Sequence, residues 1–139
     1  MAGVILTAAS ALKSGVTKYQ VTWVSDVAGT VGGSVFTVKM GTILSVEFIP
    51  GVGPTQPDNL YDLDCLDANG VSVFENGAGA TIGANLSNAI TQHFSPVDGQ
   101  SSVSVYRRWF YGGPLQLTVS NAGDTNSGVG NIYMVDGVV

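Results

Sequence analysis

The feature that most constrains the fold of this chain is an alternation of apolar and polar residues that recurs from residue 17 to the end. The alternating apolar sets are Tyr19/Val21/Trp23, Phe36/Val38/Met40, Leu44/Val46/Phe48, Tyr61/Leu63/Cys65 and Leu115/Leu117/Val119. A period of two is typical of strands with one buried face. Clusters of Gly, Pro, Asn and Asp separate the sets, and no long helical pattern is present. The sequence therefore predicts an all-β chain.

About seven or eight strands with turn signals between them predict an antiparallel β-sandwich or jelly roll. Residues 75–101 have little alternation and much Gly, Asn and Ser, which predicts one long irregular loop; a short helix within Asn85–His93 is the alternative. We find no internal repeat and no interdomain linker. We expect residues 17–139 to form a single β-sandwich domain, and residues 1–16 to form an N-terminal arm or short helical turn lying on a neighbouring subunit.

Two turns have distinct sequence signals. The tetrapeptide DANG (Asp67–Gly70) predicts a hairpin with a type I′ turn, because Asn-Gly suits the positive φ angles of that turn. The stretch Val119–Val135 has a Gly/Asn/Asp-rich centre between two apolar runs. Residues of these types tolerate positive φ or hydrogen-bond their own backbone. We therefore predict a second hairpin at Val119–Val135.

The chain carries unusually few charges. Charged residues make up 11% of its 139 residues and mean hydropathy is +0.29, whereas an average domain has about 25% charged residues. No apolar run reaches the roughly 18 residues of a membrane-spanning helix, so we expect no membrane partner. A monomer of this composition would expose much neutral surface. The composition therefore predicts that other subunits cover part of it.

Charge and cysteine content exclude further classes of protein. The net charge is −5, and of five basic residues only Arg107 and Arg108 are adjacent. A nucleic-acid-binding protein shows a clustered basic patch, so we expect no direct nucleic-acid partner. Cys65 is the only cysteine, which excludes an intrachain disulfide and a cysteine zinc site. This usage fits a reducing compartment.

Three features carry weak signals of a chemical site. The cluster Asp62, Asp64 and Asp67 with Asn69 has the ligand types that Ca²⁺ prefers, but its register does not fit an EF-hand. We interpret it as the wet face of a strand and its turn, with cation binding left open. The Gly-rich residues 76–85 lack phosphate-loop spacing and a following lysine.

His93 is the third feature, but the sequence contains no G-x-S-x-G nucleophile motif that could form a catalytic site with it. We therefore expect no enzymatic activity, no cofactor, and no catalytic or metal-binding residues.

The segment YRRWFY is different because it gathers two of the five basic residues and four aromatic residues within six positions. Tyr, Trp and Arg are enriched among interface hot spots. The candidate partner-interface residues are Tyr106, Arg107, Arg108, Trp109, Phe110 and Tyr111. Two alternatives remain open: a strand with Trp109 inside and both arginines solvated, or a platform for sugar or single-stranded nucleic acid.

The order of motifs resembles that of a group of small virion proteins of tailed bacteriophages, over roughly residues 17–135. The motifs are YQVTWVSDVAGTVGG, GTILSVEFIPGVGPTQPDNLYDLDCLDANGVSVFENG, ANLSN and GGPLQLTVSNAGDTNSGVGNIYMV. In those proteins a W-S-D-x-x-G strand end, a Pro-rich loop into Y-D-x, a D-x-x-G hairpin and a terminal L-x-V-x-N-A-G-x-x-x-S-G hairpin recur. The resemblance implies a head cement, or decoration, protein with a jelly-roll-like sandwich, and supplies no catalytic residues.

From this resemblance we expect the chain to bind the outer surface of a phage capsid and to stabilise it by bridging neighbouring major capsid subunits. The expected partners are the major capsid protein and further copies of the chain, as a homodimer or homotrimer. The expected location is the virion, after assembly in the host bacterial cytoplasm. The alternative is a phage tail-associated or cell-surface β-sandwich that recognises glycan through Trp109 and Tyr111.

Overall fold

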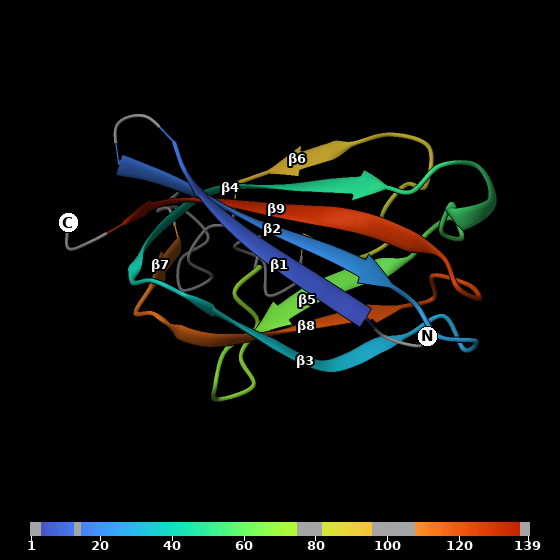
Figure 1. Cartoon of the computed structure of the whole chain (residues 1–139), viewed down its shortest axis with the longest axis horizontal. Helices are drawn as coiled ribbons and strands as arrows, with labels where there is room; N and C mark the ends of the chain where they lie inside the picture. The colour runs from blue at the N-terminus through green and yellow to red at the C-terminus, as the bar shows by residue number, and fades with distance from the viewer. Residues whose placement is uncertain (1–3, 13–14, 75–81, 96–107, 137–139) are drawn as a thin grey trace, which may run out of the picture.

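The structure is a computed structural model that describes residues 4–12, 15–74, 82–95 and 108–136, and this part of the chain is all-β (Figure 1). The nine strands are β1 (Val4–Ala11), β2 (Val16–Val24), β3 (Val31–Val38), β4 (Gly41–Pro50), β5 (Asp62–Leu66), β6 (Gln92–Phe94), β7 (Arg108–Phe110), β8 (Gly113–Ser120) and β9 (Ser127–Asp136), with one 3-10 turn, η2 (Gly53–Thr55). None of the described residues forms a helix long and apolar enough to cross a membrane.

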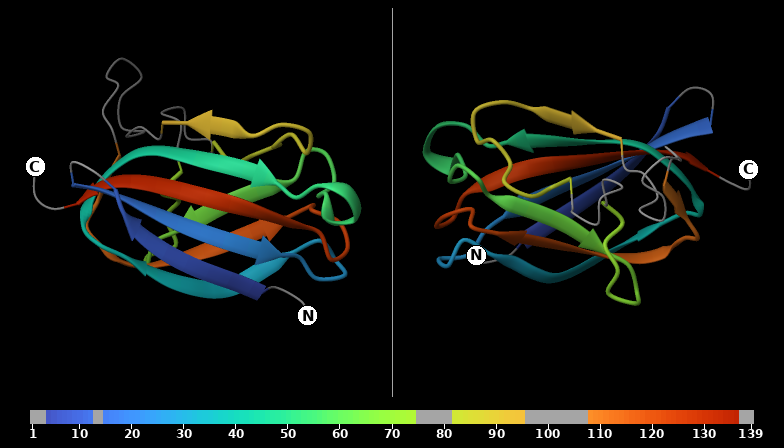
Figure 2. Two further views of the ribbon diagram at one scale, coloured as in Figure 1. Left: turned by 45° about the horizontal axis from the view of Figure 1, so that its top comes forward. Right: turned by 180° about the vertical axis from the view of Figure 1, so that it is seen from behind.

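Two antiparallel sheets pack face to face as a sandwich, as Figure 2 shows. The larger sheet has the order β1-β2-β9-β4-β6, with β7 also paired to β4, and the smaller sheet has the order β3-β8-β5. The connections β2–β3, β3–β4, β4–β5 and β8–β9 each pass from one sheet to the other. The antiparallel β-sandwich that the sequence predicts is therefore confirmed.

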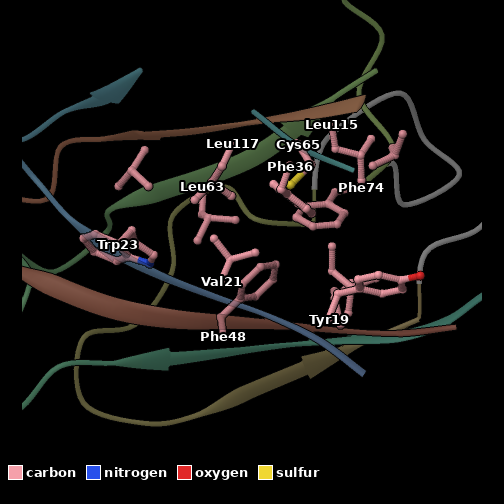
Figure 3. Close-up of a cluster of buried hydrophobic side chains, with 14 of the residues drawn as sticks. Tyr19, Val21, Trp23, Phe36, Phe48, Leu63, Cys65, Phe74, Leu115 and Leu117 are labelled. Atoms are coloured by element: carbon pink, nitrogen blue, oxygen red, sulfur yellow. The ribbon is translucent and has the colours of Figure 1, made fainter. Parts of the chain in front are cut away.

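The core lies between the sheets and is built from the alternating positions seen in the sequence (Figure 3). Strand β2 buries Tyr19, Val21 and Trp23, while β5 and β8 bury the apolar residues of their inward faces from the opposite side. The labelled core residues are Tyr19, Val21, Trp23, Phe36, Phe48, Leu63, Cys65, Phe74, Leu115 and Leu117. Period-two alternation thus identified the inward faces of these strands correctly.

The alternation fails where the backbone departs from regular pairing. A register shift between Ile43 and Ser45 interrupts the pairing of β4 with β9. Because the extra residue reverses the alternation, Ile43 is buried and Leu44 is only half-buried. Met40 was expected to share the face of Phe36 and Val38, but β3 ends at Val38 and Met40 is 38% exposed.

The predicted hairpin at Val119–Val135 is wrong. Strand β8 pairs with β3 and β5, whereas β9 pairs with β2 and β4, so the turn between them crosses from the smaller to the larger sheet. Local alternation specifies that two strands exist but not which strands they pair with. The turn is held by bonds to other loops, described below.

The DANG turn does join two antiparallel segments, but it is not type I′. Leu66 and Ser72 form an antiparallel bridge, and the Val73 N–H donates to the Cys65 carbonyl at 2.9 Å. Gly70 has φ of 78°, whereas Asn69 is not among the described residues with positive φ. A type I turn followed by a left-handed residue has this pattern.

Two further expectations concern irregular segments. The structure describes residues 82–95 of the expected long loop, and they contain strand β6 and no helix. Within the expected N-terminal arm, Val4–Ala11 form β1, which pairs with β2 of the same chain, and the Leu12 N–H donates to the Val16 carbonyl at 2.7 Å. This part of the arm is a strand rather than a helical turn; its contact with a neighbouring subunit stays a prediction.

Candidate interaction surface

Strand β7 contains the described part of the YRRWFY segment. Tyr106 and Arg107 lie outside the described residues, and of Arg108 the structure describes only its place in the strand. β7 pairs with the first residues of β4, with Phe110 opposite Gly41 and Trp109 opposite Thr42. Only Phe110 points into the core, at 2% exposure, while Trp109 is 42% exposed. The alternative that placed Trp109 inside is therefore wrong.

Tyr111 follows β7 and is 52% exposed. Its ring packs against that of Phe110 with centroids 5.0 Å apart. Partial desolvation, followed by the charge of Asp67 in the DANG turn, raises the pKa of Tyr111. Tyr111 thus lies between Phe110 and the DANG turn while half of its surface is exposed.

Gly112 brings this segment against the β3–β4 turn. Its φ is +91°, and a Cβ atom at this position would lie 2.9 Å from the Met40 backbone nitrogen. Glycine is therefore required both by conformation and by space. The close approach places the partly exposed Met40 beside the β7–β8 connection. We call Met40, Trp109 and Tyr111 together the aromatic edge.

The two ends of the sandwich differ in the charges that they carry. At the end of the aromatic edge, Lys39 directly precedes Met40 and Arg108 directly precedes Trp109. The opposite end, where the loops after β2, β4 and β8 meet, carries Asp26, Asp58 and Asp124. We call this second region the crossover end. The end of the sandwich that holds the aromatic edge thus carries charges of both signs, because Asp67 and Asp136, which pairs opposite Gly41, lie there as well.

The crossover end joins three connections that each pass between the sheets. The Ala122 N–H donates to the Gly29 carbonyl at 3.0 Å, and the Asp58 N–H donates to the Ala122 carbonyl at 2.9 Å. Asn126 adds a side-chain bond, from Nδ2 to the same Ala122 carbonyl, at 2.7 Å. The turn motifs WSDVAG, PDN and NAGDTNSG, separate in the sequence, therefore form one hydrogen-bonded unit.

The same turn is built twice in this chain. In Asp26–Thr30, the Asp26 N–H donates to the Thr30 carbonyl, the Gly29 N–H donates to the Asp26 carbonyl, and Oδ1 of Asp26 accepts from the N–H groups of Ala28 and Thr30. The turn beginning at Asp67 repeats all four bonds one for one. The shared pattern Asp-x-x-Gly is visible in the sequence. In each turn the aspartate side chain accepts backbone hydrogen bonds, which gives Asp26 and Asp67 a structural role.

Two aspartates of the acidic cluster accept hydrogen bonds from neighbouring loops. Asp62 accepts hydrogen bonds from the Asn85 N–H at 2.8 Å and from Asn121 Nδ2 at 2.7 Å. Asp64 accepts from Ser72 Oγ at 2.6 Å. Within the described ranges, no group of three or more His, Cys, Asp or Glu side chains could hold a metal ion. These carboxylates therefore fix loops against β5.

His93 lies on the outer face of the larger sheet. Its Nδ1 is 3.2 Å from Oε2 of Glu47, and its side chain is 67% exposed. Oε1 of Glu47 accepts a hydrogen bond from Asn131 at 2.7 Å. His93, Glu47 and Asn131 occupy directly opposite positions on β6, β4 and β9. They form a cross-strand polar row in which His93 is exposed and Asn131 is buried, at 3% exposure.

The sandwich interior is filled. A cavity between the sheets, lined in part by Val21, Phe48 and Phe74, measures about 10 Å³. A single water molecule needs at least about that much space, so a small-molecule ligand does not fit there. A second hollow, of about 440 Å³, is lined by Ala11, Thr17, Tyr19, Thr37 and Lys39. Candidate function in the described part of the chain therefore lies outside the core, and the aromatic edge is the candidate surface that the sequence analysis singled out.

Comparison with known proteins adds no further assignment. A scan against protein-family models, a search of curated proteins and a search of solved structures each returned no match. The fold itself defines the class: an all-β domain made of two antiparallel sheets packed as a sandwich.

Proposed function

We propose that this chain is a structural virion protein that binds the outer surface of a phage capsid and bridges neighbouring major capsid subunits. The observation that carries the proposal is the aromatic edge: Trp109 in β7 is 42% exposed and Tyr111, which follows the strand, is 52% exposed, while Phe110 between them is buried in the core. Partly exposed aromatic side chains held rigidly are typical anchors of protein interfaces. The motif order of the sequence, which resembles that of phage decoration proteins, supplies the partner.

The packing of Tyr111 favours its use as an interface anchor. Its ring contacts that of Phe110, which is buried, so binding costs less side-chain entropy than it would for a free side chain. A protein that binds only the assembled shell stabilises that state by mass action. Many identical sites on a shell also let contacts of modest affinity act together. A compact sandwich with anchors on its surface meets these requirements.

A binding experiment with capsids that lack this protein tests the proposal. Purified wild-type protein is expected to sediment with such capsids and to raise the temperature at which they disassemble. The double substitution Trp109→Ala/Tyr111→Ala is expected to abolish cosedimentation. Val35, which is 61% exposed on the smaller sheet, supplies the matched control: Val35→Ala should bind as the wild type does.

Copy number in purified virions gives an independent measurement. A decoration protein is present in numbers comparable with the major capsid protein. A few copies per particle, located at the tail, would contradict the proposal. So would unchanged capsid binding by the folded double variant. Replacing Arg107 and Arg108 together by Ala tests whether these two cations contribute; weakened binding with an unchanged fold is expected.

The exposed aromatic pair also favours a second function, recognition of glycan by a tail-associated or cell-surface module. Aromatic rings with one accessible face are suited to stacking on sugar rings as well as on protein. A glycan that raises the melting temperature of the wild type, but not that of Trp109→Ala, would support this function. A flat response across a broad glycan array, together with capsid binding, would leave the decoration function as the better account.

A further inference from the structure

The edges of the two sheets differ in how they are closed. The free side of β4 is covered by β6 and β7. The free side of β5 is covered by the returning segment, through the Leu66–Ser72 bridge and the bond from Val73 to Cys65. Strand β3, at the other edge of the smaller sheet, has a register shift between Val31 and Ser34. Covering strands and irregularities of this kind prevent edge-to-edge association.

Strand β1 has no such protection. It is the outermost strand of the larger sheet (Figure 2) and pairs with β2 through eight consecutive residue pairs without a register shift. Among the described residues, no strand pairs with its other side. Its sequence, VILTAASA, contains no charged residue, no Pro and no Gly. Natural edge strands usually carry Lys, Pro or a bulge at such a position.

We propose that β1 pairs antiparallel with β1 of a second copy of this chain, across a two-fold axis, so that the larger sheets of two molecules become one continuous sheet. Antiparallel addition of a strand satisfies the open backbone groups of the edge. Two-fold pairing of identical strands forms a closed, isologous interface. This inference does not depend on the capsid proposal, because its evidence is the edge of β1 alone.

The sequence of β1 fits pairing with itself. Directly opposite residues lie on the same face of a sheet, so a two-fold axis perpendicular to the sheet lies midway between one residue of β1 and the same residue of the second copy. With the axis at Thr7, Ile5 lies opposite Ala9 of the second copy, and Leu6 lies opposite Ala8. With the axis at Ala8, the bulky positions again lie opposite small ones.

Large residues occupy the first half of β1 and small residues most of the second, which makes the strand complementary to its own antiparallel copy. With the axis at Thr7, a Thr–Thr pair forms at the centre, and such cross-strand pairs are favourable. No like charges meet in either register, because the strand has none. This complementarity, together with a chain that is only 11% charged, favours a second copy over an unrelated strand as the occupant.

The test is the oligomeric state of the full chain at micromolar concentration, measured by sedimentation velocity or by light scattering after gel filtration. We expect a dimer. Ala8→Lys places two like charges at or beside the two-fold axis, and the dimer dissociation constant should rise about fivefold or more. Gln20 lies opposite Ala8 on β2, one strand in from the edge. Gln20→Lys therefore adds the same charge without reaching the axis and should leave the dimer intact.

A crosslinking experiment keeps the test valid if Ala8→Lys fails to fold. Ala8→Cys places a thiol near the axis and should give a covalent dimer under a short thiol-reactive crosslinker, whereas Gln20→Cys should not. Circular dichroism and thermal unfolding establish that each variant is folded. A monomeric or trimeric wild type would overturn the inference. A folded Ala8→Lys variant with unchanged dimer affinity, or equal crosslinking of both cysteine variants, would overturn it too.

Discussion

Ser25 and Asn126 are 101 positions apart in the chain and exchange hydrogen bonds in both directions. The Ser25 N–H donates to the Asn126 carbonyl at 2.8 Å, and the Asn126 N–H donates to Ser25 Oγ at 3.0 Å. The Ser25 hydroxyl also donates to the Gly123 carbonyl at 2.6 Å. Both residues are buried. They join the β2–β3 connection to the β8–β9 connection, so they fasten together two places where the chain changes sheets.

We expect Ser25→Ala to destabilise the protein by about 1–3 kcal/mol, because it leaves the buried Asn126 N–H without its side-chain acceptor. Chemical denaturation followed by tryptophan fluorescence gives the free energy of unfolding. Ser127→Ala is the control, since Ser127 lies at the same end and its hydroxyl reaches the Thr55 carbonyl only at 3.5 Å. Its effect should stay within about 0.5 kcal/mol. Equal losses for both variants would contradict the role assigned to Ser25.

The two Asp-x-x-Gly turns permit a matched comparison of Gly29→Ala with Gly70→Ala. Both glycines have nearly the same positive φ, +77° and +78°, so each substitution carries a conformational cost of roughly 1–2 kcal/mol. At Gly70 a Cβ atom meets nothing within 4 Å, whereas at Gly29 it lies 2.6 Å from the Gly123 backbone nitrogen. The clash should add about 1–3 kcal/mol for Gly29→Ala.

Urea denaturation of both variants measures this difference. It reports how tightly the β2–β3 turn packs on the β8–β9 turn, because the conformational cost cancels between the two variants. Equal destabilisation of the two variants would show that the turns do not pack as the structure has them.

The predictability of this fold depends on which of its interactions are local. The inward faces of β2, β5 and β8 follow from alternation, because the pattern within each strand is enough to predict that Val21, Leu63 and Leu117 are buried. The partner of each strand does not follow. Leu117 and Ile132 lie close in the sequence but in different sheets, since long-range bonds such as that between Ser25 and Asn126 decide where the chain crosses.

The aromatic edge, too, could be predicted from local sequence patterns only in part. In YRRWFY both alternating sets contain aromatic residues, so periodicity leaves open which face is buried. The pairing of Phe110 with Gly41 settles it in the structure. Met40 joins the aromatic edge only because Gly112 brings the two turns together. The positive φ of Gly112 and the early end of β3 are consequences of tertiary packing that the sequence signals do not contain.

The different burial of Phe110 and Trp109, which are neighbours in β7, gives a mutational prediction. Phe110 is 2% exposed, so Phe110→Ala should cost about 3–5 kcal/mol of folding stability. Trp109 is 42% exposed, so Trp109→Ala should cost less than Phe110→Ala, at most about 3 kcal/mol. Thermal and denaturant unfolding of the two variants check the order. A larger loss for Trp109→Ala would place the indole, rather than the phenyl ring, in the core.

Asp26 gives a prediction about acid. Hydrogen bonds from the Thr30 N–H, then from the Thr30 hydroxyl, and more weakly from the Ala28 N–H, hold the pKa of Asp26 below its ordinary value of 3.8. A carboxyl group whose pKa is lower in the folded protein than in the unfolded chain stabilises the fold at pH values above its unfolded pKa. This stabilisation is lost as the pH falls through the folded pKa. We therefore expect Asp26 to contribute to a loss of stability below about pH 4.

Titration of the Asp26 carboxyl by carbon-detected NMR measures this effect directly. Thr30→Val removes the hydroxyl donor, which lies 2.9 Å from Oδ2 of Asp26, and should move the pKa of Asp26 upward. A wild-type pKa at or above 3.8, or one that Thr30→Val does not change, would contradict the assigned hydrogen bonding.

The thiol of Cys65 should be unreactive toward thiol reagents in the native protein. Its side chain is fully buried, and burial, followed by the neighbouring Asp64 charge, raises the pKa of the thiol well above its ordinary value. Only the thiolate attacks a disulfide reagent, so Ellman's reagent should react through opening of the sandwich. Val27→Cys places a second thiol at a position that is 83% exposed. That thiol should react at once, and Cys65 roughly a thousandfold more slowly, with a rate that rises with denaturant in parallel with unfolding. Rapid labelling of the wild type under native conditions would mean that β5 does not lie inside the sandwich.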